Sequence, residues 1–153
     1  MAGPTSPSLS RLFTQLMGRQ VTFVPATPLP NTTAQQAYGI YTVFPDETAA
    51  IIQCDLSLLG AFAGALVGLP DSTVKEYLRA KPIEEILRDA MYEVLNVASS
   101  AISAEGRTVL TKMVTDPASI EGAAANTLKK PAHKYYFNVT VQGYQGGRFS
   151  ILQ

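Results

Sequence analysis

The feature that most constrains the fold is an apolar run at residues 56–69, which carries no charge and lies between Asp55 and Asp71. Its 14 residues are too few to cross a bilayer, which takes about 20. Residues 57–68 are apolar on nearly every side of a helix, as in helices that pack against several neighbours. We therefore expect a buried core helix, around which the rest of the chain must fold.

Three glycines in this helix recur at every fourth position, namely Gly60, Gly64 and Gly68. Residues at this spacing lie on one side of a helix, and glycine allows a neighbour to approach closely. Membrane helices dimerise through the same spacing, but this run is too short for that role. We expect the stripe to pack tightly against a sheet or a partner.

The rest of the chain alternates between helical and β patterns. Apolar spacing and turn residues predict helices at 9–17, 71–79 and 83–102, and strands at 21–24, 37–44, 48–54, 108–114, 135–141 and 147–152. Turn residues at 45–47 and 143–147 predict two hairpins. This order indicates an α+β fold, with a mostly antiparallel sheet packed against helices. We expect residues 1–153 to form one domain, with residues 1–7 as a flexible lead.

Composition excludes several classes of function. One cysteine, Cys54, and one histidine, His133, cannot form an internal disulfide or a zinc cluster. Twelve basic and twelve acidic side chains cancel, which argues against recruitment by nucleic acid or an anionic membrane. The basic cluster at 129–134 is better interpreted as a solvated loop than as a nucleic-acid site. The N-terminus has no basic segment followed by an apolar run, so we expect a cytoplasmic protein.

The charges are unevenly distributed along the chain. Residues 71–93 carry ten of the 24 charged side chains. Only 16% of the residues are charged, against about 25% in an average soluble domain. We therefore expect the segment 71–93 to face water or a partner.

The long helix predicted at 83–102 has a broad apolar face and a narrow polar strip. The apolar face comprises Ile83, Ile86, Leu87, Ala90, Met91, Val94, Leu95, Val97, Ala98 and Ala101. Asp89, Glu93, Asn96 and Ser100 fall within an arc of about 60° on the same helix. A carboxamide can hold a water molecule, and a carboxylate can engage a cation such as a partner's lysine. On this spacing alone, ordinary solvent-facing side chains remain the better interpretation.

The wider context resembles the CheC/CheX/FliY chemotaxis phosphatases. The resemblance rests on Asp89-Ala-Met-Tyr-Glu93-Val-Leu-Asn96, on Pro117 and on the segment TAAIIQCDLSLLGAFAGALVG at 48–68, and its order covers most of the chain. Pro117 follows Asn96 by 21 residues, slightly fewer than is usual in the family, and the glycine that often follows the motif is missing. The N-terminal helix carries no Glu-x-x-Asn, so the chain is most similar to the single-site CheX kind.

The resemblance implies a phosphatase that hydrolyses the aspartyl phosphate of a phosphorylated CheY-like receiver protein. Glu93 would pair with the receiver's active-site lysine, and Asn96 would align the attacking water. Asp89 would support the strip or contact the receiver, and Ser100 and Pro117 would have similar supporting roles. The receiver's own acidic residues would hold Mg²⁺, so no cofactor is expected on this chain.

A homodimer is also implied by the resemblance, because proteins of the CheX kind form homodimers. Two alternatives remain open. In the first, the chain is a non-catalytic module that binds a receiver or a flagellar-switch component. In the second, it is an unrelated α+β domain whose polar strip has no function. The N-terminus and the apolar run together predict no membrane insertion.

Overall fold

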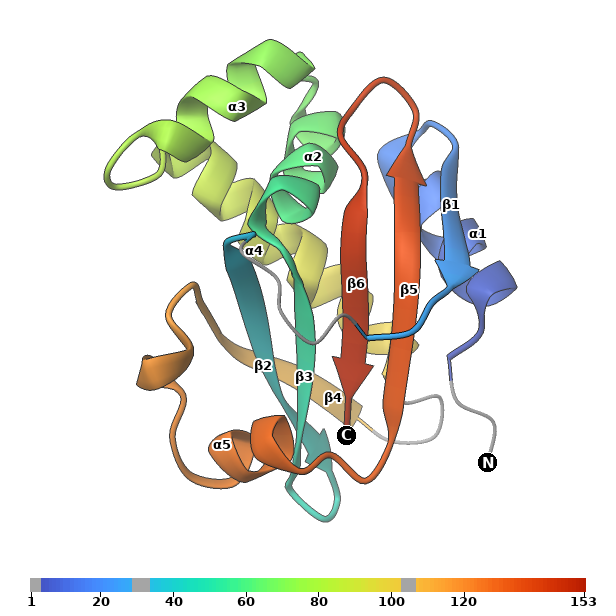
Figure 1. Cartoon of the computed structure of the whole chain (residues 1–153), viewed down its shortest axis with the longest axis vertical. Coiled ribbons are helices and arrows are strands. Elements are labelled where there is room, and N and C mark those ends of the chain that lie inside the picture. The colour runs from blue at the N-terminus through green and yellow to red at the C-terminus, as the bar shows by residue number, and fades with distance from the viewer. Residues whose placement is uncertain (1–3, 29–33, 103–106) are drawn as a thin grey trace.

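Six strands among the described residues form one sheet, and every neighbouring pair is antiparallel (Figure 1). The computed structural model describes residues 4–28, 34–102 and 107–153. In sheet order the strands are β1 (Val21–Pro25), β5 (Lys134–Val141), β6 (Gly147–Leu152), β3 (Thr48–Asp55), β2 (Gln36–Phe44) and β4 (Arg107–Val114). Both predicted hairpins form, as β2–β3 and β5–β6. The predicted α+β fold with an antiparallel sheet is confirmed.

Helices pack on both faces of the sheet, but to unequal extents (Figure 1). In chain order the helical elements are α1 (Ser6–Met17), α2 (Leu56–Val67), α3 (Asp71–Arg79), α4 (Glu85–Ala98), η1 (Ser99–Ala101), η2 (Pro117–Ser119) and α5 (Gly122–Lys129). Helices α1, α2 and α4 share the main core with one face of the sheet. Helix α5 covers part of the opposite face, where Ala124 joins a smaller core with Tyr38 and Ile40.

Strand β3 contributes to both cores, which explains the apolar run at residues 49–52 in the middle of the strand. Ile51 belongs to the smaller core beneath α5, whereas its neighbours Ala50 and Ile52 belong to the main core. Successive side chains of a strand point to opposite faces, so a strand covered on both sides is apolar throughout. Cys54 is buried and unpaired, as predicted for a small hydrophobe, and burial raises the pKa of its thiol.

The predicted core helix is confirmed as α2, whose residues from Leu58 to Ala65 are buried. In the described part of the chain, none of the helices combines the length and hydropathy required to span a bilayer. The glycine stripe has a different partner from the one we predicted. A Cβ atom on Gly60 would lie 2.7 Å from Leu78 of α3, and one on Gly64 would overlap Val74 of α3. Gly60 and Gly64 therefore receive side chains of a neighbouring helix in the same chain. Gly68, the third glycine, has no atom within 4 Å of its Cβ position and instead ends α2 in the left-handed conformation.

Three helical boundaries differ from the sequence predictions. Helix α1 already begins at Ser6, capped by Thr5, so residues 6 and 7 lie in its first turn. Helix α4 begins at Glu85 and ends at Ala98, and a 3₁₀ turn then continues to Ala101. The sequence predicts that residues 104–106 end this helix, and they lie outside the described residues. Helix α5 was not predicted, because its eight residues bury only Ala124 and have no strong apolar period.

Candidate functional site

Helix α4 is held against strand β2 by contacts at Leu95, the residue before Asn96. A Cβ atom on Gly39 would lie 3.1 Å from Leu95 Cδ2, so the missing side chain allows the helix to approach the strand. The Tyr41 hydroxyl donates a hydrogen bond of 2.6 Å to the Leu95 carbonyl oxygen. Burial raises the pKa of that hydroxyl well above its usual value, with smaller contributions from Cys54 and Tyr92, so it stays a donor. The backbone beside Asn96 is therefore fixed to the core.

The outer side of α4 carries the three predicted residues Asp89, Glu93 and Asn96, and all three are exposed. They occupy positions i, i+4 and i+7 of one continuous helix, so they lie along one side of it. The buried side of the helix comprises Leu87, Ala90, Met91, Val94, Leu95 and Ala98. The structure thus presents the predicted strip to solvent on a helix whose other side is anchored in the core.

The side chains of Asp89, Glu93 and Asn96 make no hydrogen bond or ion pair within the described ranges. By contrast, many other polar side chains on the surface are engaged, such as Ser119, which donates to the Asp116 carbonyl oxygen at 2.7 Å. A carboxylate and a carboxamide without internal partners keep their full capacity to bind groups of another molecule. The strip can therefore receive a cation at Glu93 and a water molecule at Asn96.

Two large apolar side chains lie on either side of the strip. Ile86 is 53% exposed and Tyr92 is 42% exposed. At 100° per residue, Ile86 lies on one side of the line through Glu93 and Asn96, and Tyr92 lies on the other. The sequence predicts Ile86 on the apolar face, and this prediction is wrong: Ile86 lies in the first turn of α4, at the edge of the buried face of the helix. Of the two, Tyr92 is of a residue type that is enriched in protein interfaces.

The exposed part of α4 is acidic. Glu84, Glu85, Asp89 and Glu93 are exposed there, against one exposed cation, Arg88. Glu84 occupies the N-cap position without a capping hydrogen bond from its side chain, and Glu85 lies in the first turn, where negative charge interacts favourably with the helix dipole. The surface therefore favours a partner that presents positive charge. We call this surface, made up of residues 84–96 on the outer side of α4, the acidic face.

The two remaining predicted residues lie outside residues 84–96. Ser100 is exposed in η1, the 3₁₀ turn that follows α4, and its hydroxyl donates to the Val97 carbonyl oxygen at 3.2 Å. Its place in the polar strip stays a prediction. Pro117 is exposed in η2, where the Asp116 side chain caps the turn by accepting from the Ala118 amide at 3.0 Å.

Sequence reasoning missed Tyr41 and the exposure of Ile86 and Tyr92. Tyr41 lies 54 residues before Leu95, and no local pattern relates a strand tyrosine to a helix carbonyl. The exposed Tyr92 had a signal in the sequence, because it is the aromatic residue within the Asp89 to Glu93 turn. In the described part of the chain, no three His, Cys, Asp or Glu side chains gather as metal ligands would.

Comparisons with known proteins identify the fold. No family model and no curated protein matches the sequence. Among solved structures, FliM in the FliG–FliM complex from H. pylori has a TM-score of 0.63 at 12% identity, over 95% of this chain and 84% of that one. FliY from Thermotoga maritima has a TM-score of 0.59 at 12% identity, over 99% and 85%. The FliM middle domain from H. pylori has a TM-score of 0.57 at 14% identity, over 96% and 83%. At these identities the similarity shows a shared fold.

Proposed function

We propose that this chain, whose fold is that of the FliM middle domain and FliY, is a phosphatase that hydrolyses the aspartyl phosphate of a CheY-like receiver protein. The observation that carries the proposal is the pair Glu93 and Asn96. The two side chains lie one turn apart on α4, are exposed and have no internal partner among the described residues. The Tyr41 hydrogen bond to Leu95 fixes the backbone next to Asn96.

Hydrolysis requires the two side chains to enter the receiver's active site together. The Glu93 carboxylate pairs with the receiver's lysine, and the Asn96 carboxamide holds a water molecule in line with phosphorus. The water oxygen bonds to phosphorus as the bond to the aspartate oxygen breaks, which yields inorganic phosphate and the free carboxylate. Mg²⁺ bound by the receiver would neutralise charge on the phosphoryl oxygens. Because an acyl phosphate is already reactive, alignment of the water supplies the acceleration.

The surroundings of the pair favour docking of a folded protein. Ile86 and Tyr92 supply apolar contacts on either side of the pair, and the carboxylates of Glu85 and Asp89 complement a cationic active site. Asp89, one turn before Glu93, contacts the receiver beside its lysine. The homodimer and the cytoplasmic location stay predictions.

The experiment that tests the proposal measures the lifetime of phosphate on a cognate receiver, with and without this protein. We expect the wild-type chain to shorten the lifetime and Asn96→Ala to restore the spontaneous rate, because that variant keeps the fold and loses the water-aligning group. Asn126→Ala on the exposed side of α5 is the matched control, and it should behave as wild type. For Glu93→Ala we expect weaker binding of the phosphorylated receiver, with Glu76→Ala as its control.

A second candidate is a docking module without catalysis. It is favoured by the highest TM-score reported above, which belongs to FliM in a complex with FliG. The acidic face would then bind a receiver or a flagellar-switch protein without hydrolysis. Verified receiver binding with an unchanged phosphate lifetime would support this candidate and reject the phosphatase.

A further inference from the structure

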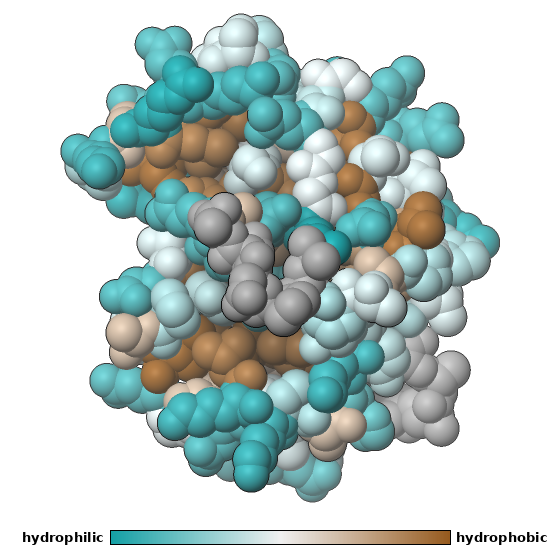
Figure 2. Space-filling view, viewed as in Figure 1, coloured by the Kyte–Doolittle hydropathy of each residue, from teal (hydrophilic) through white to brown (hydrophobic). Residues whose placement is uncertain are grey.

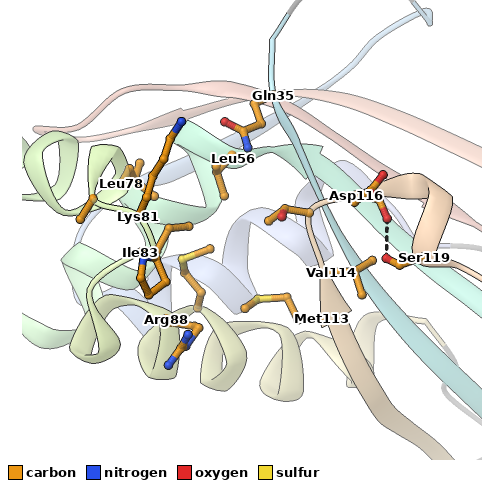
Figure 3. Close-up of a pocket in the computed structure, with 14 residues that line it drawn as sticks. Gln35, Leu56, Leu78, Lys81, Ile83, Arg88, Met113, Val114, Asp116 and Ser119 are labelled. Carbon is orange, nitrogen blue, oxygen red and sulfur yellow. Dashed lines mark hydrogen bonds between the residues drawn. The ribbon is translucent and has the colours of Figure 1, made fainter.

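A cleft of about 500 Å³ lies between the loop that joins α3 to α4 and the turn η2 (Figure 3). Its apolar surface comes from α2, from the segment that runs from α3 into α4, and from β4. Leu56 and Met91 are buried at its base, and Leu78, Ile83 and Met113 are half-buried around them. In the space-filling view, hydrophobic surface is visible in a hollow beneath the hydrophilic rim formed by α3 (Figure 2).

The cleft continues into a second hollow of about 660 Å³, with which it shares Gln35, Leu56, Leu78 and Lys81. Four cations line this extended cleft: Lys75, Arg79 and Lys81 along one edge, and Arg88 on α4. Lys75 pairs with Asp71 at 3.1 Å, whereas Arg79 and Lys81 have no ion pair within the described ranges. In Figure 3 the Lys81 amine and the Asp116 carboxylate stand at opposite ends of the cleft. We call residues 75–81 along this edge the basic rim.

We propose that this cleft binds a segment of a partner protein in which acidic residues flank an apolar side chain. The apolar side chain would fill the space above Leu56 and Met91, and burial of apolar area would supply the attraction. The acidic residues would lie beside Arg79 and Lys81, which have no internal partner to give up. A basic segment would bind poorly, because its cations would meet Arg79 and Lys81 and like charges in contact cost several kcal/mol.

The shape of the cleft favours a peptide segment over a compact small molecule. The two hollows extend past Lys81 as far as Gln145 in the β5–β6 turn, so the charged groups are spread along a channel. Small-molecule sites instead place a few polar groups around one enclosed space. An acidic segment is also repelled by the acidic face of α4, which limits it to the cleft side of the helix. The proposal uses none of Asp89, Glu93 and Asn96, so it stands independently of the phosphatase.

The test uses three fluorescein-labelled peptides of about nine residues and the wild-type chain. The first peptide has one central leucine flanked on both sides by Asp and Glu, the second replaces the acidic residues by lysine, and the third replaces the leucine by serine. We expect fluorescence anisotropy to report binding of the first peptide, with the other two about tenfold weaker or worse. Failure of the first peptide to bind, or equal binding of all three, would overturn the proposal.

Methionine methyl signals locate the binding site within the chain. Met91 and Met113 line the cleft, whereas Met17 is buried in the core beneath α1 and serves as an internal control. With ¹³C-methyl methionine, we expect the first peptide to shift the Met91 and Met113 signals and to leave the Met17 signal in place. Shifts confined to Met17, or no shift at saturating peptide, would reject the cleft as the site.

Charge reversal at the rim tests the recognition chemistry. Lys81→Glu changes an exposed side chain and should weaken binding of the first peptide about tenfold, since it puts a like charge beside the acidic residues. Lys130→Glu, an exposed lysine beyond α5, is the matched control and should bind as wild type. Equal loss in both variants would show bulk attraction and contradict the proposal. Binding of phosphatidylserine vesicles that depends on Lys81, without binding of the peptide, would assign the cleft to a membrane and also overturn it.

Discussion

The acidic face of α4 and the basic rim of the cleft come from the same charge-rich segment, yet they differ in sign and in shape. The acidic face is an open helix surface with Glu85, Asp89 and Glu93, whereas the basic rim places Arg79 and Lys81 beside an apolar cleft. In the sequence the segment 71–93 is one run of mixed charge. The difference shows that a chain with a net charge of zero can have two surfaces of opposite charge, each suited to a different partner.

The segment 71–93 therefore is not a single partner-facing surface. Its acidic half leads into the strip that carries Glu93 and Asn96, while its basic half lies along α3 and the following loop. The chain changes direction between the halves at Lys81 and Pro82, where α3 has ended and α4 has not begun. Variants that damage one surface and spare the other provide the sharpest tests of this division.

The largest effect is expected from Gly64→Val in α2. The new side chain would overlap Val74 and force α3 away from α2, which should lower the free energy of unfolding by about 3 kcal/mol. Peptide binding at the basic rim should be weakened more than receiver binding at the acidic face, because α3 carries the rim and does not carry the face. Urea unfolding measures the stability, and Val74→Ala in the same chain should recover part of the loss. A stability equal to wild type would contradict the close α2–α3 packing.

The next effect is expected from Tyr41→Phe, which removes the hydrogen bond to the Leu95 carbonyl oxygen. A buried carbonyl left without its donor should cost about 1–2 kcal/mol of stability. Because the bond fixes the backbone beside Asn96, phosphatase activity should fall while peptide binding in the cleft is unchanged. Tyr135→Phe, a half-buried tyrosine on β5, is the control. Equal loss of phosphatase activity and of peptide binding would show that Tyr41 stabilises the whole fold and not the backbone beside Asn96 in particular.

A smaller effect is expected from Ile86→Ser on the acidic face. Removal of an apolar contact at the edge of an interface should weaken receiver binding by about 1 kcal/mol, roughly fivefold, with the fold intact. Val67→Ser, which changes another exposed apolar side chain at the end of α2, is the matched control. Titration of both variants against the phosphorylated receiver measures the effect, and unchanged affinity for Ile86→Ser would remove Ile86 from the docking surface.

The smallest effect is expected from Lys75→Ala on the basic rim. Its ion pair with Asp71 spans one turn of α3, and the two side chains are 42% and 29% exposed. Exposed pairs at this spacing contribute about 0.3–0.5 kcal/mol, so thermal unfolding should shift only slightly and the shift should vanish in 1 M salt. A salt-independent loss would indicate that Lys75 contacts the core through its aliphatic stem.

Much of the fold could be predicted from the sequence, because its signals are local. The hairpin of β2 and β3 follows from two β-type runs around Pro45, and α2 follows from an apolar run of limited length. Helix α5 could not be predicted, because its contact with Tyr38 and Ile51 joins segments about 70 to 90 residues apart. For the candidate site, the alignment of Asp89, Glu93 and Asn96 along one side of a helix could be predicted from their spacing. The exposure of Ile86 could not be predicted, because neighbouring elements decide which edge of a helix is covered.

The sequence by itself determined the period of each element, the line of Asp89, Glu93 and Asn96 along one helix, and the burial of α2. These properties depend on residues a few positions apart, which the backbone geometry relates directly. Only the tertiary structure decided that Tyr41 donates to the Leu95 carbonyl oxygen, that α3 packs against Gly60 and Gly64, and that the charge-rich segment 71–93 contributes to two separate surfaces. Each of these depends on contacts between distant segments, and packing rather than local geometry selects them.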